Sequence, residues 1–138
     1  MGKEDYGMRK PKSWKLTLTD EQFNCIARGM EMYHRLLCGQ LSELNNLSDQ
    51  GDLTIEDVSH LQRQLFPQLP HGSYYKWDGS AAQGEFHEKE AAQSYQVYRA
   101  MVYHRTIRDD KAPDWSVYRE PPLASNKVES IKVEYNGK

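Results

Sequence analysis

Residues 18–44 read LTDEQFNCIARGMEMYHRLLCGQLSEL, and this stretch decides the fold class. It opens with a capping-box pattern of Thr19 and Gln22, flanked by Leu18 and Phe23 as a hydrophobic staple. Apolar residues then recur at steps of three and four, which is the spacing of an amphipathic helix: Phe23, Ile26, Ala27, Met30, Tyr33, Leu37, Leu41 and Leu44. The pattern predicts one long helix that ends near residues 45–46, with Gly39 as a bend or a close contact.

Two further helices are predicted downstream. Residues 54–57 (TIED) open the first of them, with Leu53 and Val58 placed as a second hydrophobic staple, and Pro67 ends it because proline has no amide hydrogen to donate. Its apolar residues are expected to face inward: Ile55, Val58, Leu61 and Leu65. The other helix is expected from about His87 to Arg108.

Short segments with period-two alternation predict strands near both ends of the chain. They are residues 14–18 (WKLTL), 115–118 (WSVY) and 131–135 (IKVEY), and the last is placed to pair with the first. We therefore predict an α+β fold, a helix-rich small domain over residues 13–136 with three main helices and a few short strands. Residues 1–12 are expected to form a mobile tail, and residues 67–86 form an unusually long loop.

Composition narrows the function classes. A chain of 138 residues fits one domain, and its formal net charge of −2 lacks the basic field that holds a nucleic-acid polymer. No apolar run approaches the roughly 20 residues that span a bilayer, so we expect a cytoplasmic protein without membrane contact. Cys25 and Cys38 would lie roughly 20 Å apart along one helix, too far for a disulfide, and are expected to stay reduced.

A row of polar residues on the third predicted helix is the first candidate site. Gln96, Arg99 and Tyr103 are spaced to share one helical face. A guanidinium fork can hold a phosphate and stack on a ring, and an amide and a phenol can bind the edge of a base. The alternative is structural: Arg99 pairs with a carboxylate such as Glu31 or Glu43, and Tyr103 is interhelix packing.

A second set of polar residues lies on the first helix and could complete the site on the third: Tyr33, Arg35 and Gln40. The alternative for Arg35 is a solvated face or an oligomer interface. The complete predicted ligand-binding set also takes in neighbours of Arg99: Tyr33, Arg35, Gln40, Tyr95, Gln96, Arg99, Tyr103 and His104. We expect a small nucleotide-type ligand at these residues.

Motifs for catalysis, metals or cofactors are missing. None of the five histidines stands at a metal-binding spacing, and there is no nucleophile elbow and no glycine-rich phosphate loop. We therefore predict binding rather than turnover, with no cofactor and no metal. In the long loop, Tyr74, Tyr75 and Trp77 are either an anchor for a partner or a cap on the core.

Four stretches of the sequence are similar to a known protein family: LTLT at 16–19, EMYHR at 31–35 with Gly39-Gln40, YQVYR at 95–99 and VYREPPL at 117–123. Together they resemble a family of small uncharacterised tailed-phage proteins. Tyr98 stands where that family's pattern has an aliphatic residue, and the 67–86 loop has no counterpart in it.

Similarity to small phage accessory proteins implies an anti-defence factor. Such a factor would be a sponge that sequesters a nucleotide signal of Thoeris or CBASS immunity, such as a cyclic ADP-ribose derivative or a cyclic dinucleotide. The alternatives are a phage protein that inhibits a host protein and, third, an enzyme that cleaves the signal. We also expect a homo-oligomer, because a domain this small cannot cover all of its long amphipathic helix.

Overall fold

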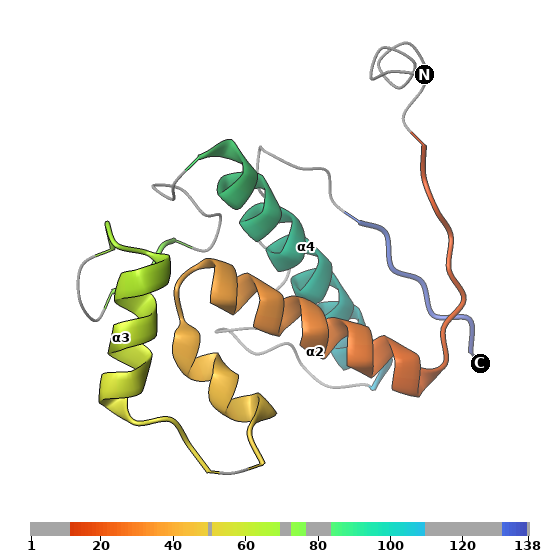
Figure 1. The fold of residues 1–138 in the computed structure, drawn as a ribbon. Helices are drawn as coiled ribbons and strands as arrows, with labels where there is room; N and C mark the ends of the chain where they lie inside the picture. Colours follow the sequence, from red (N-terminus) through yellow and green to blue (C-terminus); the bar gives the residue numbers. More distant parts are fainter. Residues whose placement is uncertain (1–11, 50, 70–72, 77–83, 110–130, 138) are drawn as a thin grey trace, which may run out of the picture.

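The computed structural model describes residues 12–49, 51–69, 73–76, 84–109 and 131–137. Within these ranges four helices follow one another: α2 (Asp20–Leu37), the 3-10 helix η1 (Leu41–Leu47), α3 (Ile55–Leu65) and α4 (Glu85–Arg108). α2 and α4 pack along each other. η1 and α3 lie at one end of this pair, and the extended segments 12–18 and 131–137 lie at the other (Figure 1).

The predicted capping box at Thr19 is confirmed, and Thr54, where the next helix was expected to open, forms a second one. Thr19 Oγ1 accepts from the Gln22 amide at 3.1 Å, and Gln22 Oε1 accepts from the Thr19 amide at 2.9 Å. Thr54 and Asp57 form the same reciprocal pair at 3.0 and 3.2 Å. These bonds satisfy amides that the first helical turn cannot pair, which explains why α2 and α3 begin at Asp20 and Ile55.

The first helix is shorter than predicted. It ends at Leu37, and Gly39 follows in the left-handed region with φ of 89°. A right-handed helix cannot continue through that dihedral, so the chain turns and resumes as the separate helix η1. Gly39 is both a bend and a close contact, because a Cβ built on it would lie 2.7 Å from Leu69 Cδ2.

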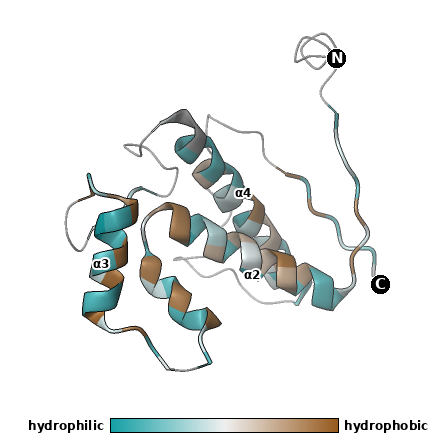
Figure 2. Cartoon of the chain, in the orientation of Figure 1, coloured by the Kyte–Doolittle hydropathy of each residue, from teal (hydrophilic) through white to brown (hydrophobic). Residues whose placement is uncertain are grey.

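The predicted α+β class is wrong for the part of the chain that the structure describes. Segments 14–18 and 131–135 are extended, but neither belongs to a strand. In 131–135 the alternation reflects one-sided packing, since Ile131 and Val133 lie against the core while Lys132 and Glu134 are exposed. In 14–18 it does not, because Trp14 and Leu16 are 88% and 73% exposed. Figure 2 shows the hydropathy of both segments along the chain. The predicted strand at 115–118, the resembling stretch at 117–123 and nearly all of the predicted tail 1–12 lie outside the described residues.

Two apolar clusters form the core. The larger joins α2 to α4 through the buried residues Ala27, Tyr95, Tyr98, Met101 and Val102. The smaller surrounds Cys38, Tyr75 and Ala91, with Leu37, Phe66 and Leu69 packed against it. The second cluster therefore connects the α2–α4 pair to the end of α3.

The predicted inward face of α3 is correct only in part. Val58 and Leu61 are partly buried, but Ile55 is 82% exposed and Leu65 is 60% exposed. Among the described helices the backbone of α3 approaches η1 alone. One short neighbour covers only a narrow stripe of a helix, which leaves the ends of the apolar row in solvent.

Candidate functional site

A buried polar row on α4 is the first candidate site. Gln96 and Arg99 are only 3% and 5% exposed. Gln96 Nε2 and the Nε and Nη2 atoms of Arg99 have no hydrogen-bond partner in the described part of the chain. Buried guanidinium groups are nearly always paired, so this row is chemically incomplete.

The predicted structural partners of Arg99 are engaged elsewhere. Glu31 Oε2 accepts from Arg35 Nε and Nη2 at 3.2 and 2.9 Å, and Glu43 lies 4.0 Å from the same guanidinium. The structural reading of Arg99, an ion pair with Glu31 or Glu43, is therefore wrong. An unpaired buried charge is costly, and an anionic group brought to Arg99 would offset that cost.

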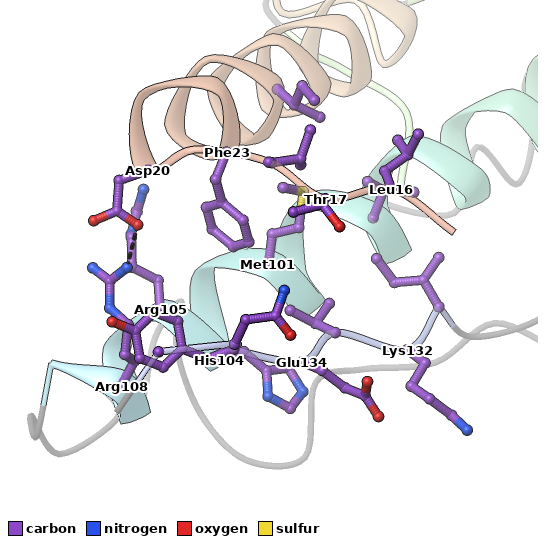
Figure 3. Close-up of a pocket in the computed structure, with 18 of the residues that line it drawn as sticks. Leu16, Thr17, Asp20, Phe23, Met101, His104, Arg105, Arg108, Lys132 and Glu134 are labelled. Carbon is purple, nitrogen blue, oxygen red and sulfur yellow. Dashed lines mark hydrogen bonds and ion pairs between the residues drawn. The ribbon is translucent and has the colours of Figure 1, made fainter. Parts of the chain in front are cut away.

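Aromatic rings stand beside this row. The Arg99 guanidinium lies 5.4 Å from the centroid of the Tyr95 ring, at cation–π distance. Tyr103 is buried on the same helix, one turn beyond Arg99, and its ring centroid is 5.2 Å from that of His104. His104 itself is exposed and lies at the edge of a groove on another side of α4 (Figure 3). The structure thus places Tyr95, Gln96, Arg99 and Tyr103 together and separates His104 from them.

The predicted residues of the first helix form a different group. Arg35 donates through Nη1 to Gln40 Oε1 at 3.2 Å, in addition to its bonds with Glu31. Burial alone would lower the pKa of Arg35, but the hydrogen bond and the charge of Glu31 raise it above its ordinary value. The guanidinium of Arg35 is therefore already committed to carboxylates and an amide.

Tyr33 joins α2 to α4. Its hydroxyl donates to Glu90 Oε2 at 2.7 Å. Burial, followed by this hydrogen bond to a carboxylate, raises the pKa of Tyr33 to about 12. The phenol is held as a donor to Glu90, which leaves its oxygen lone pairs as the part that can meet a ligand.

Sequence reasoning missed a buried cluster of His34, Cys38 and Tyr75. His34 Nδ1 lies 2.9 Å from the carbonyl oxygen of Ala91, and its Nε2 lies 3.8 Å from Cys38 Sγ. The Tyr75 amide donates to the Cys38 carbonyl at 2.8 Å. The spacing of four between His34 and Cys38 was visible in the sequence, but the approach of Tyr75 depends on the long loop.

This cluster holds its histidine neutral. Desolvation by burial lowers the pKa of His34 to about 4, against a smaller opposing effect of the hydrogen bond to Ala91. Because a carbonyl oxygen only accepts, Nδ1 carries the proton and Nε2 faces the thiol without one. Cys25 and Cys38 form no disulfide in the structure, and Cys25 is exposed whereas Cys38 is buried.

The aromatic residues of the long loop were expected to be either an anchor for a partner or a cap on the core, and the described ones differ. Tyr75 caps the smaller core cluster, with its ring centroid 5.9 Å from that of Phe66, whereas Tyr74 is exposed. Trp77 lies outside the described residues.

Two cavities among the described residues lie beside α2 and α4, and neither of these two is lined by Gln96 or Arg99. The larger is an apolar groove of about 710 Å³ between the extended terminal segments and the α2–α4 pair. Phe23 and Met101 point into it in Figure 3, and an ion pair of Arg108 Nη1 with Asp20 Oδ1 at 2.6 Å closes one side. Arg99, which is only 5% exposed, is enclosed and lies outside this groove.

Within the described ranges, no three histidine, cysteine or acidic side chains gather closely enough to hold a metal ion. None of the described helices combines the length and apolar character needed to cross a membrane. No family model, curated protein or solved structure matches this chain.

Proposed function

We propose that this protein binds and sequesters a small anionic ligand of the nucleotide type, without turning it over. The observation that carries the proposal is that Arg99 is 5% exposed as a residue, while Nε and Nη2 of its guanidinium are unpaired in the described part of the chain. These two nitrogens form one side of the guanidinium fork, which matches two oxygens of a phosphate. Gln96 Nε2, unpaired and one turn away on α4, adds a neutral donor.

Aromatic rings beside the guanidinium support a ligand that also carries a ring. Tyr95 lies against Arg99, and Tyr103 is buried one turn further along the helix. We rank Arg35, Gln40 and Tyr33 behind these residues, because each already has a hydrogen-bond partner within the chain. His104 falls outside the group, on the groove side of α4.

Binding without catalysis follows from the donors at the site. A guanidinium stays protonated and an amide does not titrate, so neither acts as a nucleophile or general base at neutral pH. An enzyme that cleaves the ligand is the weaker alternative for this reason.

The resemblance to tailed-phage proteins supplies the biological part of the proposal. We propose an anti-defence sponge in the cytoplasm, the host's if the gene is carried by a phage. Its ligand would be a cyclic ADP-ribose derivative or a cyclic dinucleotide, and the protein would work as a homo-oligomer. Since Arg99 is enclosed, the ligand enters only after local opening, and association should be slower than the usual 10⁵–10⁷ M⁻¹s⁻¹.

The test has two stages. Mass spectrometry of small molecules released on denaturing protein purified from phage-challenged cells should show a nucleotide-type compound. Calorimetric titration with cyclic ADP-ribose isomers and cyclic dinucleotides then compares wild type with Arg99→Ala. Removing a charge-assisted hydrogen bond should weaken binding about ten- to a hundredfold. Arg63→Ala, an exposed arginine on α3, is the matched control and should bind as wild type does.

Failure of wild type to bind any member of the panel, with no released compound, would reject the sponge. The host-protein alternative would then lead, with the exposed Tyr74 as its described anchor in the loop. Equal weakening by Arg99→Ala and Arg63→Ala would place the ligand elsewhere on the chain.

A further inference from the structure

The extended segment 131–137 has an unpaired backbone. None of these residues makes a hydrogen bond within the part of the chain that the structure describes, and neither do residues 13–18 beside it. Extended backbone with free amide and carbonyl groups is a template for pairing with another chain. Segment 131–137 therefore offers an edge at the open end of the molecule (Figure 1).

This segment is nevertheless held in place on its own chain. Ile131 and Val133 pack against the larger core cluster. Tyr135 lies under the Arg108 guanidinium, 5.2 Å from Cζ to the ring centroid, and Arg108 is fixed by its ion pair with Asp20. A segment that is anchored by its apolar face and free along its backbone is prepared to pair without refolding.

The polar face of the segment has a charge pattern that complements itself. Lys132 and Glu134 are exposed and point away from Phe23 and Met101 in Figure 3. When two copies of IKVEY run antiparallel with Val133 opposite Val133, each Lys132 stands opposite the Glu134 of the second copy. Ile131 then stands opposite Tyr135. Opposite charges and aromatic–β-branched pairs are the favourable cross-strand combinations.

We propose that residues 131–135 form the dimer interface of this protein, by antiparallel pairing with the same residues of a second copy about a two-fold axis at Val133. Such an interface uses one surface twice, which is the commonest symmetry of homo-oligomers. Trp14 and Leu16 line the adjacent groove while 88% and 73% exposed, and they give the second copy further apolar surface to cover. This surface lies away from Arg99, and the dimer does not depend on the proposed ligand.

A competing register involves the other free segment. Residues 14–18 of a second copy, run antiparallel to 131–135, would bring Lys15 opposite Glu134. The two registers respond differently to exchanging the charges of Lys132 and Glu134. In the self-paired dimer the exchange preserves both opposite-charge pairs, whereas in the competing register it places a lysine opposite Lys15.

The experiment measures the oligomeric state of the full chain by light scattering and sedimentation from about 1 to 100 μM. Wild type should have twice the 16.1 kDa mass of one chain. Lys132→Glu and Glu134→Lys each turn two attractions into two repulsions, and each should raise the dissociation constant at least about tenfold. The double variant Lys132→Glu/Glu134→Lys should return to the wild-type value, and Lys15→Glu should leave that value unchanged.

Circular dichroism and melting of each variant show that the fold is retained, so that a change of mass reports pairing. A wild type that stays at 16.1 kDa at 100 μM would overturn the proposal. A double variant that stays as weak as the single variants would also overturn it. Calorimetry on Glu134→Lys keeps the two proposals separate, because loss of the dimer with unchanged ligand binding leaves the Arg99 site standing.

Discussion

The imidazole of His34 on α2 donates its Nδ1 proton to the carbonyl oxygen of Ala91 on α4, across 2.9 Å. The bond joins the two longest helices where the larger and smaller core clusters meet, since the His34 ring lies 5.0 Å from Tyr95 and its Nε2 faces Cys38. A protonated imidazole would put a positive charge at this buried position. The helix pair is therefore sensitive to the protonation state of one side chain.

Acid should destabilise the protein through His34. Its folded pKa of about 4 lies below the ordinary 6.5, so the unfolded chain binds more protons in that window. The contribution of neutral His34 to the free energy of unfolding is complete above pH 6.5. It falls by roughly 3 kcal/mol as the pH drops to about 4. Urea midpoints at pH 7, 6 and 5 measure the effect. His34→Gln, which keeps an amide donor for Ala91, should flatten the profile, while exposed His60→Gln should not.

Replacing Gly39 by alanine should destabilise the turn after α2. The left-handed φ of 89° and the 2.7 Å approach of Leu69 Cδ2 to the new Cβ both oppose a side chain. We expect a loss of about 1–3 kcal/mol in the free energy of unfolding by urea. Gly29→Ala is the matched control within α2, where a Cβ meets nothing within 4 Å, and should gain about 0.5–1 kcal/mol. An unchanged stability for Gly39→Ala would contradict the assigned geometry.

Gln62 should be a structural residue of α3. It is buried, and its Nε2 donates to the carbonyl oxygens of Gly39 at 3.0 Å and of Ser73 at 2.9 Å. Gln62→Leu leaves both carbonyls without this donor and should cost about 1–3 kcal/mol by urea denaturation. Exposed Gln64→Leu on the same helix should stay within about 0.5 kcal/mol of wild type. Equal effects of the two changes would argue against the Gln62 contacts.

Arg99 should be dispensable for folding. Because its guanidinium is buried without a partner among the described residues, Arg99→Met should leave the melting temperature equal or higher, with a gain of up to roughly 4 kcal/mol. Arg35→Met is the comparison, since it removes the half-buried pair with Glu31 and should cost about 1 kcal/mol. Unfolding of Arg99→Met at room temperature would show that Arg99 is held by a structural partner.

Local hydrogen bonding made the helix starts predictable. Thr19 with Gln22, and Thr54 with Asp57, close bonds between residues three apart, so four letters of sequence are enough to place them. The end of α2 was harder to place. Glycine occurs within helices at modest cost, and the contact of Gly39 with Leu69 that favours the turn is separated by 30 positions.

The sequence predicts which residues of the candidate site share one face of α4, but it does not predict which groups surround them. The spacing of Gln96, Arg99 and Tyr103 on one helix follows from helical geometry alone. Whether Arg99 has a carboxylate depends on which arginine captures Glu31 and Glu43, and Arg35 does so because it lies one turn from Glu31 on α2. The strand prediction failed for a related reason: a ladder needs a second backbone at the right distance, and the alternation of apolar and polar residues does not show whether one lies there.

The sparse attachment of α3 sets how the molecule opens. Its backbone approaches η1 alone among the described helices, and Gln62 and the Phe66 ring tie its last turn to the rest. Amide hydrogens of α3 should therefore exchange with solvent deuterium together, as one subglobal unit, well before those in the middle of α4. Protease nicking in the native state should begin in this unit, so that the first long-lived fragment retains α4.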